Sequence, residues 1–98
     1  MKPEIFEGSV VISQKGRDKG RAFVVLYLVD ASFAMIADGD TRPLEKPKRK
    51  RLKHLRACPA QLRDIVEAYR GNQCKNSDLR KALFPYKPQA EAEDLGRE

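Results

Sequence analysis

Two runs of basic residues interrupt the apolar segments of this 98-residue chain and limit how it can fold. The first run spans residues 15–21, and the second spans residues 46–54. Ionised Lys and Arg side chains are costly to bury without a partner, so both runs must face solvent or an anion. Because the apolar segments beside them are short, we interpret the two runs as loops on the surface of a small β domain.

The excess of positive charge lies in the first part of the chain. Residues 1–57 hold 13 Lys and Arg against 7 Asp and Glu, a net charge of +6, whereas residues 58–98 hold 7 of each. The stretch 42–56 alone carries 8 basic residues and a single acid, Glu45. A confined excess of this kind forms a positive patch that favours a polyanionic partner, and we interpret that partner as RNA.

Short runs rich in β-branched and aromatic residues, bounded by turn signals, predict five strands. The strands are expected at residues 8–13, 22–29, 33–37, 42–45 and 52–55. Between the third and fourth, Asp38-Gly39-Asp40 is a strong hairpin signal. The second strand is apolar on both faces, so one face fills the core and the other face needs a cover.

Two helices are predicted after the strands. Pro59 suits a first helical turn and Gly71 a helix end, and the apolar residues between them recur at the spacing of an amphipathic helix. This apolar stripe consists of Leu62, Ile65, Val66 and Tyr69. A second short helix is expected to begin at Asn76 or Ser77 and to end at Pro85. The stripe is the natural cover for the outer face of the second strand.

The chain therefore divides into a β domain over residues 1–57, a helical extension over 58–88 that packs on it, and a flexible acidic tail over 89–98. No stretch resembles a signal peptide or a membrane span. Cys58 and Cys74 do not form the framework of a secreted disulfide scaffold. We expect a cytoplasmic monomer.

The first basic run has the composition of a phosphate-binding loop. Glycines at its turns would let backbone amides approach a phosphate, while the side chains between them neutralise its charge. The glycines are Gly16 and Gly20, and the cations are Lys15, Arg17, Lys19 and Arg21. The alternative is an ordinary solvated hairpin loop, in which glycine serves only to adopt a positive φ.

Residues 5–57 resemble a KOW domain: an apolar strand, a Gly-x-x-x-Gly basic turn, a second apolar strand and then an Asp-Gly turn. The matching residues are Gly8, Val10-Val11, Gly16, Lys19-Gly20, Val24-Val25, Asp30 and Asp38-Gly39. The wider pattern resembles archaeal and eukaryotic large-subunit ribosomal proteins, and still more the short bacterial KOW proteins related to them. The resemblance implies an SH3-like five-stranded β-barrel, with loops that contact ribosomal RNA and turn glycines at Gly16, Gly20 and Gly39.

The second basic run offers more cations for the same RNA. Consecutive positive charges repel one another, and an RNA backbone would relieve that repulsion through counterion release. The candidates are Arg42, Lys48, Arg49, Lys50, Arg51 and Lys53, with His54 as a residue that could stack on a base or contact phosphate. A nuclear import signal and a merely solvated loop are the alternatives.

Neither a metal site nor a catalytic site is indicated. Cys58 and Cys74 lie 16 residues apart in the sequence, without the paired spacing of a zinc site, and His54 has no carboxylate or serine in a partner motif. Three aromatic residues of the strands could form a stacking platform, but their placement favours the core. They are Phe23, Tyr27 and Phe33. We expect no cofactor.

The sequence thus predicts a mainly β protein with C-terminal helices that binds structured RNA, with ribosomal RNA as the expected ligand, without catalysis. Ribosomal proteins are further potential partners. The alternative is a protein-interaction module that docks on the transcription or translation machinery, with its basic loops only steering the encounter. If both basic runs grip one RNA, they must lie on the same side of the β domain.

Overall fold

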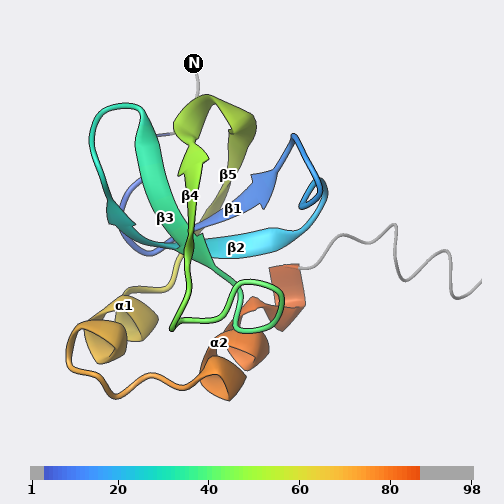
Figure 1. The fold of residues 1–98 in the computed structure, drawn as a ribbon. Coiled ribbons are helices and arrows are strands. Elements are labelled where there is room, and N and C mark those ends of the chain that lie inside the picture. Colours follow the sequence, from blue (N-terminus) through green and yellow to red (C-terminus); the bar gives the residue numbers. More distant parts are fainter. Residues whose placement is uncertain (1–3, 87–98) are drawn as a thin grey trace, which may run out of the picture.

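The computed structural model describes residues 4–86, which form one antiparallel sheet with two helices beneath it (Figure 1). This arrangement confirms the prediction of a mainly β fold with C-terminal helices. The predicted acidic tail, residues 89–98, lies outside the described residues. In chain order the elements are β1 (Ser9–Ser13), β2 (Ala22–Leu28), β3 (Phe33–Ala37), β4 (Lys48–Arg51), the 3₁₀ turn η1 (Leu52–His54), β5 (Leu55–Gln61), α1 (Arg63–Arg70), α2 (Asn76–Leu83) and the 3₁₀ turn η2 (Phe84–Tyr86).

The strands pair in the order β4-β3-β2-β1-β5, and every pair is antiparallel. Strands β1 to β4 follow one another as a meander, and β5 returns to pair with the free side of β1. Strands β4 and β5 are therefore the two edges, joined in sequence by η1. Among residues 4–86 the ladder contains no pairing of β4 with β5, so hydrogen bonds between strands do not close the sheet into a barrel.

Apolar side chains fill both faces of the sheet. Val24 and Leu26 of β2 belong to a cluster that includes the buried Leu79 and Leu83 of α2, whereas Phe23 belongs to a second cluster on the opposite face. Three residues of the predicted stripe, Leu62, Ile65 and Tyr69, pack against the first cluster, and the fourth, Val66, is buried. The helices thus cover one face of β2, as its apolar character on both sides predicts.

The first helix begins later than Pro59 predicts. Helix α1 starts at Arg63, and Pro59 lies within β5. Strand β5 is an edge strand, where the missing N–H of proline costs little. The β1–β5 register also shifts between Ser9 and Val11, so the residues around Pro59 lie in an irregular part of the ladder. Gly71 caps α1 and α2 begins at Asn76, as predicted. The end predicted at Pro85 is two residues late, because α2 ends at Leu83 and Pro85 lies within η2.

The strand expected at 42–45 is wrong, and the strand expected at 52–55 begins only at Leu55. Residues 42–45 belong to the long connection between β3 and β4, where the backbone N–H of Leu44 donates to the side chain of Asn76 (2.8 Å). Residues 52–54 form η1, and the basic run 48–51 is itself strand β4. An edge strand tolerates such charge because its outer side meets water rather than another strand.

A bulge in β2 changes which side chains face the core. The β2–β3 register shifts between Val25 and Tyr27, and the alternation of buried side chains ends there. Tyr27, which the alternation with Phe23 assigns to the core, is therefore 39% exposed. Leu28 is exposed to the same extent. The core expectation is confirmed for Phe23, which is fully buried, and wrong for Tyr27.

Candidate nucleic-acid interface

The turn between β1 and β2 holds three cations in solvent. Gly16 and Gly20 adopt φ angles of 80° and 88°, in the region that favours glycine, as predicted. The turn is tied by the N–H of Gly20, which donates to the carbonyl of Ser13 (2.8 Å). The exposed basic side chains on this turn are Lys15, Arg17 and Lys19.

The one acid of this turn points inward. Asp18 is 4% exposed, and its carboxylate accepts hydrogen bonds from the Arg42 guanidinium (3.1 and 3.3 Å) and lies 3.7 Å from the Lys48 ammonium. The contact joins the first basic run to the loop after β3 and to β4. Lys48 of the second basic run therefore lies beside the first turn. Arg42 and Lys48 are partly neutralised by this internal contact.

Lys50 contradicts the expectation that both basic runs face solvent or an anion. It is 8% exposed, and its ammonium donates to the backbone carbonyl of Lys15 (2.8 Å). The alternation along β4 turns this side chain inward, opposite Ala34, while its neighbours stay outside. A carbonyl partner makes the burial tolerable. Lys50 is therefore a structural tie between β4 and the first turn.

The other two basic residues of β4 lie over an aromatic ring. The guanidinium carbons of Arg49 and Arg51 sit 4.6 and 4.9 Å from the centre of the Phe33 ring. Attraction between a cation and the ring face orients both side chains without consuming their N–H donors. Phe33, expected in the core, is instead half-buried beneath these arginines, because it pairs with Arg51 at the edge of the sheet.

Arg21 is occupied by acids of the protein. Its guanidinium lies 3.6 Å from Asp38 and 3.5 Å from Asp40, and its Nε atom is buried without a hydrogen-bond partner. Asp38 also accepts the backbone N–H groups of Asp40 and Arg42, which holds the start of the long loop in place. Arg21 is thus a weaker phosphate ligand than its position in the first basic run predicts.

Residues of η1 extend the positive surface. Lys53 is exposed and His54 is half-buried, and the carbonyl of His54 accepts the N–H of Gln14 (2.8 Å). Burial lowers the pKa of the His54 imidazole, and the surrounding cations lower it further, Lys15 and Lys53 most among them. The positive potential of this region therefore disfavours a protonated imidazole at neutral pH.

Six of the predicted cations remain exposed and have no carboxylate within ion-pair distance among residues 4–86. We name them, together with Arg56, the edge-strand surface: Lys15, Arg17, Lys19, Arg49, Arg51, Lys53 and Arg56. Arg56 is exposed on β5 and was not among the predicted ligands, although the basic stretch 42–56 includes it. Phe33, expected in the core rather than in a stacking platform, lies beneath two of these cations because the β3–β4 register brings it to the arginines.

A hollow of about 600 Å³ opens beside this surface, between the segment before β1 and the start of β5. Its apolar lining includes Ile5, Leu52 and Leu55. Leu55 belongs to the second cluster, on the face of the sheet opposite the helices, and the other two residues pack against that cluster. Its polar lining consists of Glu4, Gln14, Lys53 and Arg56. Two cations of the edge-strand surface therefore also border an apolar hollow.

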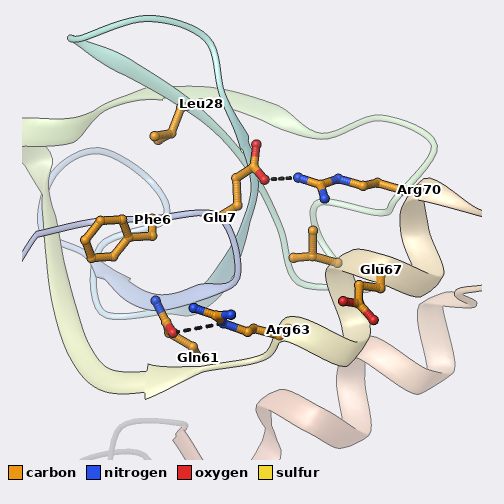
Figure 2. Close-up of a pocket in the computed structure, with 8 residues that line it drawn as sticks. Phe6, Glu7, Leu28, Gln61, Arg63, Glu67 and Arg70 are labelled. Carbon is orange, nitrogen blue, oxygen red and sulfur yellow. Dashed lines mark hydrogen bonds and ion pairs between the residues drawn. The ribbon is translucent and has the colours of Figure 1, made fainter.

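A second hollow, of about 660 Å³, lies along one side of α1, from Arg63 to Arg70 (Figure 2). Phe6 and Leu28 line it, and they are 48% and 39% exposed. Arg70 of α1 forms an ion pair with Glu7 across this hollow, and Arg63 contacts Gln61 at its border. Charges of both signs surround the apolar residues here, in contrast to the uniformly basic edge-strand surface.

The described residues 4–86 contain neither a cluster of metal-ligating side chains nor a membrane-spanning helix. No three His, Cys, Asp or Glu side chains in this range lie close enough together to hold a metal ion. Cys58 and Cys74 are free thiols, and burial, followed by the nearby Asp78, raises the pKa of Cys74. Within the same range there is no helix with the length and apolar character needed to span a bilayer.

No protein-family model matches the chain, and no curated protein matches it either.

Proposed function

We propose that this protein binds structured RNA, specifically ribosomal RNA, without catalysing a reaction. The observation that carries the proposal is the edge-strand surface, in which seven exposed cations from the first turn, β4, η1 and β5 lack acidic partners among the described residues. A cluster of this kind neutralises phosphates and releases their counterions on binding. Arginines held over a ring retain N–H donors for phosphate oxygens.

The framework beneath this surface favours rigid presentation of the charges. Lys50 ties β4 to the first turn, and Asp18 holds Arg42 and Lys48 against the same turn. Ordering two loops in advance reduces the entropy that RNA binding must overcome. We assign these residues to the framework and the exposed cations to the RNA.

The proposal extends to architecture and cellular context. We infer that the five antiparallel strands, with an apolar cluster on the face opposite the helices, are an SH3-like KOW domain. The resemblance of residues 5–57 to ribosomal KOW proteins supports this inference. A ribosome-associated role in the cytoplasm follows from it, and the free thiols of Cys58 and Cys74 are compatible with a reducing compartment.

The test reverses the two arginines of β4. We expect R49E/R51E to lower affinity for a ribosomal RNA fragment at least about tenfold, because two phosphate contacts become repulsive. The melting temperature should fall by only several degrees, because both side chains are exposed and lose chiefly their contacts with the Phe33 ring. R63E/K81E makes the same charge change at exposed positions of α1 and α2 and is the matched control. Affinity can be measured by fluorescence anisotropy.

Salt dependence gives a second measurement on the wild-type protein. If four to six phosphates are neutralised, log affinity should fall against log salt with a slope of roughly −3 to −5. R49E/R51E should lower the magnitude of that slope. Equal affinities of R49E/R51E and R63E/K81E for the RNA would contradict the proposal, because general charge rather than the edge-strand surface would then account for binding.

The second hollow favours an alternative function, a protein-interaction module that docks on the transcription or translation machinery. Exposed Phe6 and Leu28, bordered by charges of both signs, resemble the composition of a protein interface more than that of an RNA site. Sedimentation of a lysate on a sucrose gradient separates the two functions. Migration with large ribosomal subunits that salt and R49E/R51E abolish favours RNA binding, whereas migration with RNA polymerase that L28E abolishes favours the module.

A further inference from the structure

We propose that the hollow beside η1 binds an unpaired nucleotide: a base within it and the attached phosphate at its border. The inference rests on the proposed RNA binding and deepens it, because it makes the ligand an RNA with an unpaired base rather than a continuous duplex. Two cations of the edge-strand surface, Lys53 and Arg56, also line the hollow.

The lining combines the two properties that a nucleotide needs. Ile5, Leu52 and Leu55 provide an apolar wall for the faces of a flat base. Lys53 and Arg56 are exposed and have no carboxylate partner among the described residues, so they are available to a phosphate. The volume of about 600 Å³ falls within the range of roughly 300–1,000 Å³ typical of small-ligand sites.

Two further polar groups suit the edge of a base. The side-chain amide of Gln14 offers both a donor and an acceptor, and its side chain makes no hydrogen bond within the described residues. The Glu4 carboxylate is an acceptor for an amino or imino N–H. The backbone N–H of Gln14 donates to the carbonyl of His54 (2.8 Å). This hydrogen bond fixes the point beside η1 from which the Gln14 side chain extends. An apolar peptide side chain would leave all four polar groups unused.

A base can enter such a hollow only where it is not stacked in a helix. Sequence-dependent recognition of RNA usually relies on bases of loops and bulges, whose edges are free. The edge-strand surface would contact the phosphates on either side, and the hollow would take the base between them. The protein would therefore prefer an RNA helix with a bulge to the same helix without one.

The experiment compares a 16-base-pair RNA duplex with the same duplex carrying three unpaired adenosines, by fluorescence anisotropy at fixed salt. We expect the wild-type protein to bind the bulged RNA about tenfold more tightly, because burying part of a base against apolar side chains adds contacts that the duplex lacks. Q14A should lose about threefold to tenfold of that affinity, with binding to the duplex unchanged. Q73A makes the same change between α1 and α2, at an exposed position away from the hollow, and should behave as wild type.

A competition with AMP distinguishes a base in RNA from a free nucleotide. If AMP displaces the bulged RNA from the wild-type protein but not from Q14A, the hollow binds both a base within RNA and a free nucleotide. No displacement, together with the loss in Q14A, would support RNA alone. Equal wild-type binding of the two RNAs, or no effect of Q14A, would overturn the hollow as a base site and leave the proposed RNA binding standing. Failure to bind either RNA would instead overturn the proposed function.

Discussion

At the residue scale, the roles of the charged side chains depend on their partners. Asp18, Lys50, Arg42 and Lys48 lie in the basic segments or beside them, yet their contacts are directed toward the protein. Arg49 and Arg51 alternate with Lys48 and Lys50 along one strand, and they are the exposed members of the four. One strand of four basic residues thus supplies both a structural tie and a ligand surface, because successive side chains point to opposite faces.

Removing the buried acid should weaken the fold. Asp18→Asn leaves Arg42 and Lys48 without their carboxylate, and we expect a loss of about 1–3 kcal/mol, below the value for a fully buried pair because both cations are partly exposed. Urea denaturation monitored by circular dichroism measures the change. Asp40→Asn removes the exposed partner of Arg21 and should cost less than about 0.5 kcal/mol. Equal losses of stability in the two variants would show that the contacts of Asp18 with Arg42 and Lys48 do not stabilise the fold.

His54 reports on the potential of the surface. Burial and the surrounding cations hold its pKa below the usual value in the free protein, so the unfolded chain binds a proton more readily. The imidazole therefore contributes stability that is present above the unfolded pKa and is lost as pH falls through the window below it. Added salt should raise the pKa of His54 by screening the cations, and RNA should raise it further. NMR titration of the imidazole measures both shifts, and a pKa that RNA leaves unchanged would place the RNA away from η1.

At the element scale, the connection between β3 and β4 carries more of the structure than a tight hairpin would. It leaves β3 at Asp38 and reaches α2, where the guanidinium of Arg80 donates to the carbonyl of Gly39 (2.6 Å) and the side chain of Asn76 accepts the N–H of Leu44. Figure 1 shows this connection descending from the sheet toward α2. The loop thus links the sheet to the helices at the same time as it delivers Arg42 to Asp18.

Two glycines with similar φ angles should respond differently to substitution. Gly39 has φ 79° and Gly20 has φ 88°, so alanine strains the backbone at both, by roughly 1 kcal/mol. A Cβ at Gly39 would also collide with the carbonyl oxygen of Asn76 at the start of α2, whereas one at Gly20 meets nothing within 4 Å. We therefore expect G39A to cost more than about 2 kcal/mol and G20A about 1 kcal/mol in thermal unfolding. Equal losses of stability in G39A and G20A would mean that α2 moves away from the added methyl group at no measurable cost.

At the scale of the whole molecule, the helices complete the hydrophobic core. Leu79 of α2 is fully buried in the same cluster as Val10 of β1 and Val24 of β2. A five-stranded sheet of this length has too little apolar area to be stable with one face in water. The sheet and both helices should therefore unfold in one cooperative transition.

Truncation of a single buried leucine tests whether the sheet and the helices unfold together. We expect Leu79→Ala to destabilise the protein by about 2–5 kcal/mol, through lost burial and the cavity left behind, with one transition for sheet and helices. Leu28→Ala makes the same change at a side chain that is 39% exposed and should cost less than about 1 kcal/mol. Calorimetry measures both. A second, separate transition in the Leu79 variant would show that the helices are an independent appendage.

The sequence alone determined those features that depend on short stretches of chain. Strand 33–37, the positive φ angles of Gly16 and Gly20 and the start of α2 at Asn76 follow from local patterns of polarity and turn chemistry. The cover of β2 by helices followed from its two apolar faces. The predicted start of the first helix was wrong because pairing with the distant strand β1 holds Pro59 in the irregular edge strand β5.

Only the tertiary structure decided which cations are available to a ligand. The basic run 48–51 carries uniform charge in the sequence, and nothing local distinguishes the buried Lys50 from the exposed Arg49. Their difference arises from the β3–β4 register, which brings Phe33 to Arg51 and turns Lys50 toward the carbonyl of Lys15. Register depends on pairing between distant segments, and a shift of one residue would exchange the inward and outward side chains.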